Sequence, residues 1–177
     1  MSLVQNNLVC IKLTCIDLLV YHSYKDMSDF KLIYYFPLTE NTAMSQTEHL
    51  PLSHIKVVEF SHMVMGPSAS AILADLGADV IKIEPIGGDN TRRLRGSGAG
   101  YFAMYNRNKR SICIDLKSKR GNRLAKQLIT GADVLIENFR PGAMDKLGFG
   151  YADLAEDNEQ LIYCSTRGFL NGPYEHR

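Results

Sequence analysis

The sequence has no tryptophan, and its four cysteines form no CxxC pair. Each cysteine lies in or next to an apolar run, which favours reduced thiols over a disulfide framework or a zinc site. The histidines show no metal-ligand spacing, and neither a GxSxG elbow nor an HExxH motif occurs. We therefore expect a cytoplasmic protein that binds no metal and carries neither of these two hydrolase sites.

An excess of charge of one sign is also absent, since 20 Lys and Arg oppose 19 Asp and Glu. A chain this close to neutral produces no strong overall field towards nucleic acid or a membrane surface. No apolar run approaches the roughly 20 residues that a membrane-spanning helix needs. The composition thus predicts a soluble protein with no nucleic acid and no membrane among its partners, and any anion site must be local.

Residues 1–43 lack glycine and arginine and contain one proline, Pro37. We interpret them as an extension outside the main domain, with a short helix expected at 13–20 and a short strand at 31–36. Met44 opens a segment that leads directly into the first regular strand, so the main domain is predicted to occupy residues 44–177. One hypothesis is that translation begins at Met44 and that the upstream segment is a mis-called start; the alternative is a genuine extension.

From residue 51 onward, strand and helix patterns alternate. Gly77 and Gly131 each stop a helix and are followed by the same Ala-Asp-Val sequence, which begins a strand. Such alternation predicts an α/β fold, a Rossmann-like parallel sheet with flanking helices. The predicted strands are 55–60, 79–84, 112–116, 133–137 and 161–165, and the predicted helices are 69–76, 119–129, 143–147 and 151–158.

The loop after the strand at 133–137 carries Asn138, Phe139, Arg140 and Lys146. Ligands of open parallel sheets bind beyond the carboxyl ends of the strands. An amide, an aromatic face and two cations suit a nucleotide that carries phosphates. From spacing alone, however, a solvated basic loop is the favoured interpretation.

A second basic cluster alternates with aromatic residues between positions 92 and 110. Such interleaving can bind single-stranded nucleic acid, but the near-neutral chain without a recognised motif favours a solvated face. Residues 96–100 lack the GxGxxG spacing and a following helix start, so we interpret them as a flexible loop. The cluster consists of Arg92, Arg93, Arg95, Arg107, Lys109 and Arg110.

Five ordered motifs stand out: SHMVMGP at 61–67, ADLGADVIKIEP at 74–85, NRNKRSI at 106–112, DLK at 115–117 and ENFRPG at 137–142. Together they resemble the class III CoA-transferases, the family of formyl-CoA transferase and carnitine CoA-transferase. The resemblance runs from about residue 51 to 174. It implies a large domain built from both ends of a chain more than twice this length, and an interlocked homodimer of full-length subunits. The chain is then expected to hold an incomplete N-terminal half of that domain, truncated at its C-terminus.

The resemblance also implies a substrate, coenzyme A (CoA), carried as acyl-CoA, and a reaction. CoA would move from an acyl-CoA to a carboxylic acid through an aspartyl acyl-anhydride. The family's aspartate follows a motif beyond Arg177, so we expect CoA binding here without the nucleophile. The positions implied to contact CoA are Val64, Met65, Ile114, Asp115, Leu116, Lys117, Asn138, Phe139, Arg140 and Lys146.

Two positions depart from formyl-CoA transferase, because Val64 replaces a glutamine and Pro85 an arginine. Both weaken the case for oxalate or formate as substrates. Two other functions stay open. One is a fragment similar to α-methylacyl-CoA racemase, although the run at 106–110 resembles the transferases more. The other is a non-catalytic remnant that at most binds CoA or a full-length partner.

Overall fold

The computed structural model describes residues 8–13, 19–23, 50–168 and 172–174. These residues form one seven-stranded sheet in the order β2-β1-β5-β4-β3-β6-β7. Five of the strands run parallel to one another, which confirms the predicted α/β fold. The parallel strands are β3 (Lys56–Phe60), β4 (Asp79–Glu84), β5 (Arg110–Cys113), β6 (Val134–Glu137) and β7 (Ile162–Ser165).

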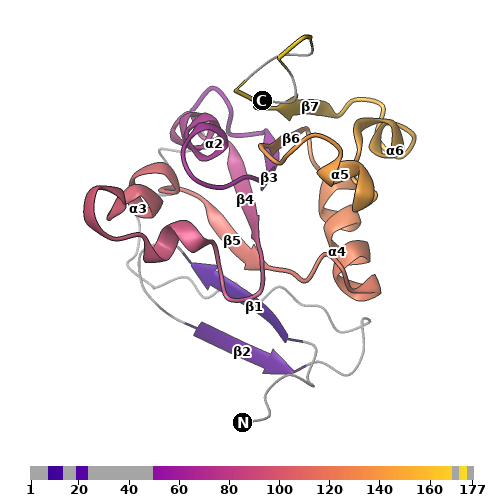
Figure 1. The fold of residues 1–177 in the computed structure, drawn as a ribbon. Helices are drawn as coiled ribbons and strands as arrows, with labels where there is room; N and C mark the ends of the chain where they lie inside the picture. Colours follow the sequence, from indigo (N-terminus) through magenta and orange to yellow (C-terminus); the bar gives the residue numbers. More distant parts are fainter. Residues whose placement is uncertain (1–7, 14–18, 24–49, 169–171, 175–177) are drawn as a thin grey trace.

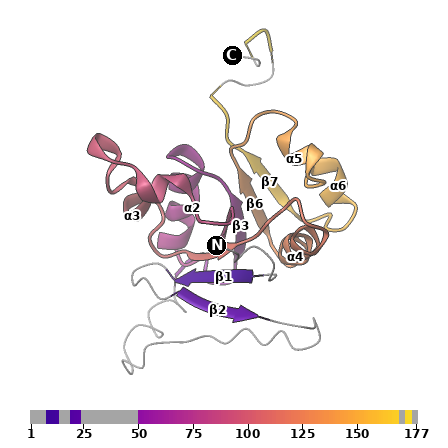
Figure 2. The ribbon, with the colours of Figure 1, turned by 60° about the horizontal axis from the view of Figure 1, so that its bottom comes forward.

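Helices cover both faces of the sheet, with α2 and α3 on one side and α4, α5 and α6 on the other (Figure 2). Two 3₁₀ turns, η2 (Asn90–Arg93) and η3 (Gly96–Gly98), lie between β4 and α3. None of the helices in the described part of the chain is long and apolar enough to cross a bilayer. The helices are α2 (Met65–Asp75), α3 (Tyr101–Tyr105), α4 (Lys119–Thr130), α5 (Ala143–Lys146) and α6 (Tyr151–Ala155).

Two apolar clusters hold the layers together. Successive side chains of a strand point to opposite faces, so Val57 packs with the α2 side and Val58 with the α4 side. On the α4 side, Phe60 and Phe149 contact each other with their ring centroids 5.5 Å apart. Leu135, fully buried in β6, lies in the same cluster. The β-branched and apolar runs read from the sequence are therefore the central strands.

Part of the N-terminal extension joins the sheet. Strand β1 (Leu8–Leu13) pairs antiparallel with β5 and with β2 (Leu19–Ser23), as Figure 1 shows at the N-terminal end of the fold. The helix expected at 13–20 is wrong for residue 13, which ends β1, and for residues 19 and 20, which lie in β2. The physical reason is that the backbone groups of a strand edge favour pairing, so β1 pairs with the edge of β5 and β2 pairs with the outer edge of β1. The strand expected at 31–36 lies outside the described residues, and the boundary at 43/44 stays a prediction.

Three further sequence predictions need correction. The strand expected at 112–116 spans Arg110–Cys113 instead, so residues 114–116 lie in the loop that follows it. The segment 96–100 does lead into a helix, α3, because Gly100 adopts a left-handed conformation (φ 89°) at its N-cap. Glycine reaches this conformation without the clash that a side chain would cause. The helix expected at 151–158 ends earlier, at Ala155.

Candidate functional site

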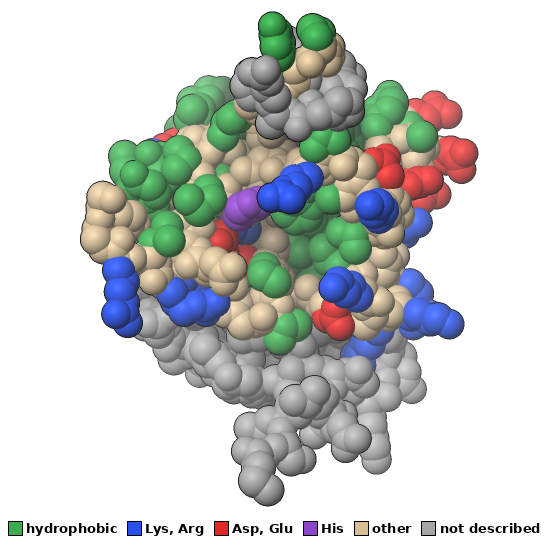
Figure 3. All heavy atoms as spheres, viewed as in Figure 1, with side chains coloured by type: hydrophobic (Ala, Val, Ile, Leu, Met, Phe, Trp, Pro, Cys, Tyr) green, Lys and Arg blue, Asp and Glu red, His purple; other side chains and the backbone are tan. Residues whose placement is uncertain are grey.

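A cleft of about 980 Å³ opens where β3, β4, β5 and β6 end. Figure 3 shows the hollow near the centre of the face, with hydrophobic side chains inside it and lysine or arginine at its rim. The position is the one expected for a ligand site of a parallel sheet, since the carboxyl ends of the strands meet at this edge. Its lining includes Phe60, Ile83, Ile114, Leu116, Leu124 and Phe139 on the apolar side and Ser61, His62, Asp89 and Thr91 on the polar side.

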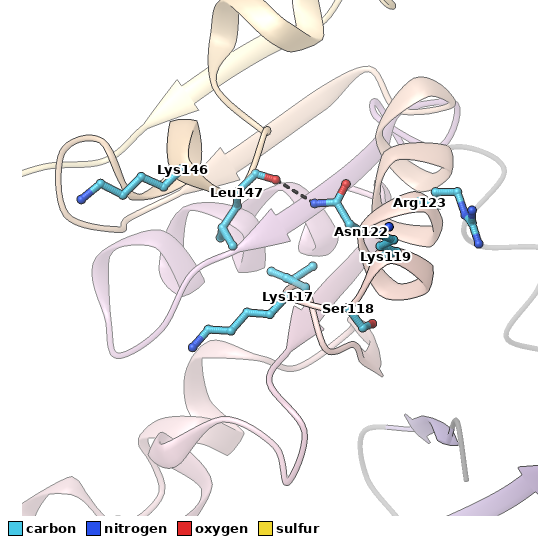
Figure 4. Close-up of a pocket in the computed structure, with 8 residues that line it drawn as sticks. Lys117, Ser118, Lys119, Asn122, Arg123, Lys146 and Leu147 are labelled. Carbon is cyan, nitrogen blue, oxygen red and sulfur yellow. Dashed lines mark hydrogen bonds between the residues drawn. The ribbon is translucent and has the colours of Figure 1, made fainter. Parts of the chain in front are cut away.

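A second pocket of about 590 Å³ adjoins the cleft and shares four lining residues with it. It lies between the start of α4 and the end of α5, and four of its lining residues are cations: Lys117, Lys119, Arg123 and Lys146. In Figure 4, Lys117 and Lys146 extend to the same side, whereas Arg123 extends to the opposite side. These two lysines therefore form a cationic rim, which we call the lysine rim.

The end of α4 that borders this pocket is firmly placed. Ser118 caps the helix, because its Oγ accepts a hydrogen bond from the Gly121 N–H (3.0 Å). Asn122 Nδ2 donates to Leu147 O (2.7 Å), which ties α4 to the residue after α5 (Figure 4). A Cβ atom at Gly121 would overlap the Asp115 carbonyl, so glycine permits the close approach of α4 to the loop after β5. The two lysines of the rim are thus carried by segments that are bonded to each other.

The turn after β3 forms one wall of the cleft. His62 N–H donates to Asn138 Oδ1 (3.0 Å), and Asn138 Nδ2 donates back to His62 O (2.7 Å). Met63 has φ 65°, in the left-handed region, and its N–H lies 3.3 Å from Thr91 Oγ1. The His62 ring lies 5.9 Å from the ring of Phe139, measured between centroids. Loops from three strands are therefore joined at this wall.

Behind the wall lies a buried charge network centred on Glu59. Its carboxylate accepts hydrogen bonds from Lys82 Nζ (2.9 Å), Lys109 Nζ (2.8 Å) and the hydroxyls of Ser61 and Ser70. Burial raises the pKa of Glu59, but the charges of Lys82 and Lys109 outweigh it and hold the pKa below its usual value. Burial lowers the pKa of Lys109 to about 8, although Glu59 opposes the change. Glu59 is therefore a stabilised anion.

The network extends to the cleft through Asp89. Lys82 Nζ lies 3.2 Å from Asp89 Oδ2, an ion pair without the alignment of a hydrogen bond. Asp89 Oδ1 accepts from both the N–H (2.8 Å) and the hydroxyl (2.6 Å) of Thr91. Burial raises the pKa of Asp89, and the hydrogen bonds from Thr91 together with the Lys82 charge bring it below its ordinary value. The carboxylate is thus committed to holding the turn that begins η2.

Four of the six cations in the basic cluster between 92 and 110 form ion pairs within the protein. Arg92 makes two hydrogen bonds to the Glu84 carboxylate (2.8 and 2.6 Å) and lies 3.7 Å over the ring of Phe102. Lys109 is bound to Glu59, as described above. Arg107 pairs with Asp75 and Arg110 with Asp79. The interpretation as a solvated face is therefore wrong for Arg92 and Lys109, whose carboxylate partners lie 8 and 50 residues earlier in the chain.

Six of the ten residues predicted to contact CoA line one of the two pockets. They are Ile114, Asp115, Leu116, Lys117, Phe139 and Lys146. Val64, Met65, Asn138 and Arg140 line neither pocket; the Asn138 amide is hydrogen-bonded to the His62 backbone. Which of the ten contact CoA stays a prediction.

None of the ten predicted contacts lies in the loop after β4, yet that loop forms part of the cleft. Pro85, Ile86 and Asn90 line the cleft, and so does Arg120 in the first turn of α4. The loop after β4 follows directly on a buried strand, at the edge of a parallel sheet where ligands bind, and this position is the signal that indicates it. Among the described residues, no group of three or more His, Cys, Asp or Glu side chains could hold a metal ion.

Comparison with known proteins adds independent evidence. Residues 52–177 match the sequence model of CoA-transferase family III. Formyl-CoA:oxalate CoA-transferase of Streptomyces coelicolor is 45% identical over 127 residues, which cover 70% of this chain and 31% of that protein. Succinate–glutarate CoA-transferase of Agrobacterium fabrum is 45% identical over 136 residues, with 70% and 34% covered.

The fold has solved counterparts. The crystal structure of a CAIB/BAIF family protein from Brucella suis is 45% identical, with a TM-score of 0.67. The similarity covers 72% of this chain and 36% of that one. The chain spans about a third of the length of the proteins that it matches.

Proposed function

The chain belongs to CoA-transferase family III, and on that premise we propose that it provides the CoA-binding cleft of an enzyme that transfers CoA from an acyl-CoA to a carboxylic acid. The observation that carries the proposal is the juxtaposition of a mainly apolar cleft with the lysine rim, Lys117 and Lys146. CoA combines the same two chemistries, because it joins phosphate groups to an adenine ring and a long pantetheine arm. The volume of the cleft also falls in the range usual for small-molecule sites.

The residues present fit the parts of CoA. Phosphate oxygens carry negative charge and form strong hydrogen bonds with lysine ammonium groups. The aromatic ring of Phe139 and the side chains of Leu116 and Ile114 offer apolar surface for the remainder of the molecule. These residues would bind and orient CoA and exclude water from its apolar portion.

In the proposed reaction, a carboxylate attacks the thioester carbonyl, forms an acyl anhydride with the enzyme and releases the CoA thiolate. The thiolate then attacks the enzyme's carbonyl in this anhydride, which releases the donor acid as a carboxylate and leaves an enzyme–CoA thioester. The acceptor carboxylate attacks that thioester to form a second anhydride and free the thiolate, and the thiolate attacks the acceptor's carbonyl to give the new acyl-CoA and restore the enzyme carboxylate. Two aspartates line the cleft, and both are engaged: Asp89 with Thr91 and Lys82, and Asp115 with the Lys117 N–H (3.0 Å). We therefore assign substrate binding to this part of the chain. A second, full-length subunit in an interlocked homodimer is the partner that we propose for it.

The acids named for the relatives differ. The Streptomyces relative is named for formyl-CoA and oxalate, and the Agrobacterium relative for succinate and glutarate, at the same identity of 45%. Pro85 lines the cleft and, like Val64, differs from its counterpart in formyl-CoA transferase. This difference favours an acid other than oxalate or formate.

Isothermal titration of CoA into the purified chain tests the proposal. Binding that is competed by acetyl-CoA and is weaker for free pantetheine is the expected result, because pantetheine lacks the phosphates that the lysine rim would bind. A cooperatively folded sample that gives no heat with CoA or acetyl-CoA would overturn the proposal.

A further inference from the structure

The turn at Ser61–Met63 is held by side chains from distant parts of the chain. Lys82 Nζ donates to Ser61 O, Asn138 binds both backbone groups of His62, and Thr91 Oγ1 accepts from Met63 N–H. Four consecutive backbone polar groups thus have partners outside the turn. Because all four groups are hydrogen-bonded, the path of the backbone is fixed. The exposed side chains of His62 and Met63 lie at the cleft.

Asn138 makes two of these connections, since its amide acts as donor and as acceptor to one residue. The two bonds, of 2.7 and 3.0 Å, join positions 76 residues apart. The two hydrogen bonds resemble those between paired residues of neighbouring strands, with the side-chain amide of Asn138 in place of a backbone peptide group. An amide that uses its nitrogen and its oxygen on the protein backbone is poorly placed to recognise a ligand as well.

The turn needs such a restraint because Met63 is in an unfavourable conformation. A residue with a long side chain rarely adopts φ 65°, and it does so only where surrounding structure enforces it. Gly66 packs closely against this turn, because a Cβ atom at Gly66 would overlap Ser61 and come within 3.4 Å of Asn138 Cγ. The strained turn, Gly66 and Asn138 form one packed unit.

We propose that Asn138 is a positioning residue that holds the His62–Met63 turn against the CoA cleft and does not itself contact CoA. The proposal rests on the proposed CoA-binding function. It replaces the role of direct contact that family resemblance implied for this residue. Without the amide, Met63 relaxes towards an ordinary conformation, and His62 leaves its place beside Phe139.

The first test compares Asn138→Ala with Asn158→Ala by calorimetric titration of CoA. Asn158 is a matched control, since its Nδ2 donates to Ala132 O (2.9 Å) and it lines neither pocket. We expect Asn138→Ala to weaken CoA binding about tenfold and Asn158→Ala to leave the affinity unchanged. Equal affinity of wild type and Asn138→Ala would overturn the proposal.

The second test separates positioning from direct contact. Glycine adopts a φ of 65° without strain, so a Met63→Gly background depends less on the restraint. We expect Asn138→Ala to reduce CoA affinity by a smaller factor in Met63→Gly than in the wild type. The same factor in both backgrounds would assign Asn138 to direct contact and would overturn the proposal.

The third test needs no ligand. Amide hydrogen exchange at His62 and Met63 is expected to accelerate at least tenfold in Asn138→Ala and to stay at the wild-type rate in Asn158→Ala. An unchanged exchange rate at both amides in Asn138→Ala would contradict the positioning role of Asn138. A wild-type chain that fails to bind CoA would refute the proposed function, while the exchange data would still decide how the turn is held.

Discussion

Lys109 and Glu59 form a buried ion pair across 50 residues of sequence, with Lys109 Nζ 2.8 Å from Glu59 Oε2. Neither side chain is accessible to solvent. Lys109 also donates to Pro67 O (2.8 Å) and Asn106 Oδ1 (3.1 Å), so the ammonium is bound on several sides. The pair therefore connects the loop before β5 to the end of β3 and to the start of α2, directly behind the wall of the cleft.

Removal of Lys109 should be strongly destabilising. In Lys109→Met the buried Glu59 keeps only Lys82 as a cationic partner, and breaking a buried pair in this way costs about 3–5 kcal/mol. Urea unfolding followed by circular dichroism measures the free energy of unfolding. Arg107→Met is the control, because its exposed pair with Asp75 should contribute less than about 1 kcal/mol. A loss of equal size in both variants would contradict the buried pair as a stabilising element.

The same pair predicts a dependence of stability on alkaline pH. The pKa of Lys109 is about 8 in the folded protein and near 10.5 in the unfolded chain, so between these values the unfolded chain holds the extra proton. The Lys109 contribution to the free energy of unfolding must then rise with pH across this window, by up to roughly 1.4 kcal/mol per unit. The difference between wild type and Lys109→Met, measured from pH 7.5 to 10, isolates it. A difference that is flat or that falls over this range would show that the lysine pKa is not lowered.

Gly121 should be intolerant of a side chain. A Cβ would overlap the Asp115 carbonyl, so Gly121→Ala must move α4 away from the loop that carries Lys117, at a cost of about 2 kcal/mol or more. Gly131→Ala at the other end of α4 meets its nearest atoms only at 3.9 and 4.0 Å, and its φ is −94°. That variant should change stability by less than about 1 kcal/mol and can even increase it. Thermal melts of the two variants provide the comparison, and equal melting temperatures would contradict the close approach.

The lysine rim should govern the ionic-strength dependence of CoA binding. Lys117→Ala and Lys146→Ala should each weaken CoA binding about tenfold at low salt, equivalent to ~1.4 kcal/mol. Lys126→Ala removes a cation from α4, outside both pockets, and should leave the affinity unchanged. The losses should shrink at 1 M salt, where charges are screened beyond roughly 3 Å. Equal effects of all three substitutions would indicate a general charge effect and not a phosphate site.

Much of the fold was predictable because its signals are local. The apolar runs at Lys56–Phe60 and Asp79–Glu84 and the glycine stops after α2 and α4 depend on neighbours within a few residues. The predictions of secondary structure were wrong where contacts with residues distant in the sequence decide whether a segment joins the sheet. Residues 114–116 look like a strand, yet they leave the sheet at the edge of the cleft, and residues 19–20 pair in a strand because β1 extends the sheet at β5.

The candidate site divides in the same way. Lys117, Phe139 and Lys146 follow strand ends, so their place at the pockets could be expected from order along the chain. Lys109 has the same local appearance, a cation in a basic run, but it is buried against a carboxylate 50 residues away. Local sequence could not separate these lysines, since the free energy of a charge depends on the partner and the solvent that surround it.

The sequence by itself determined the alternation of strands and helices, the edge of the sheet at which a ligand would bind, and membership of the family, because each of these depends on short patterns and their order. Only the tertiary structure decided which polar side chains face the cleft and which support it from behind. Asn138 is the clearest case, since an amide in a loop can serve a ligand or a backbone equally well. The position of His62, brought within hydrogen-bond distance by the folding of β3 beside β6, selects the backbone.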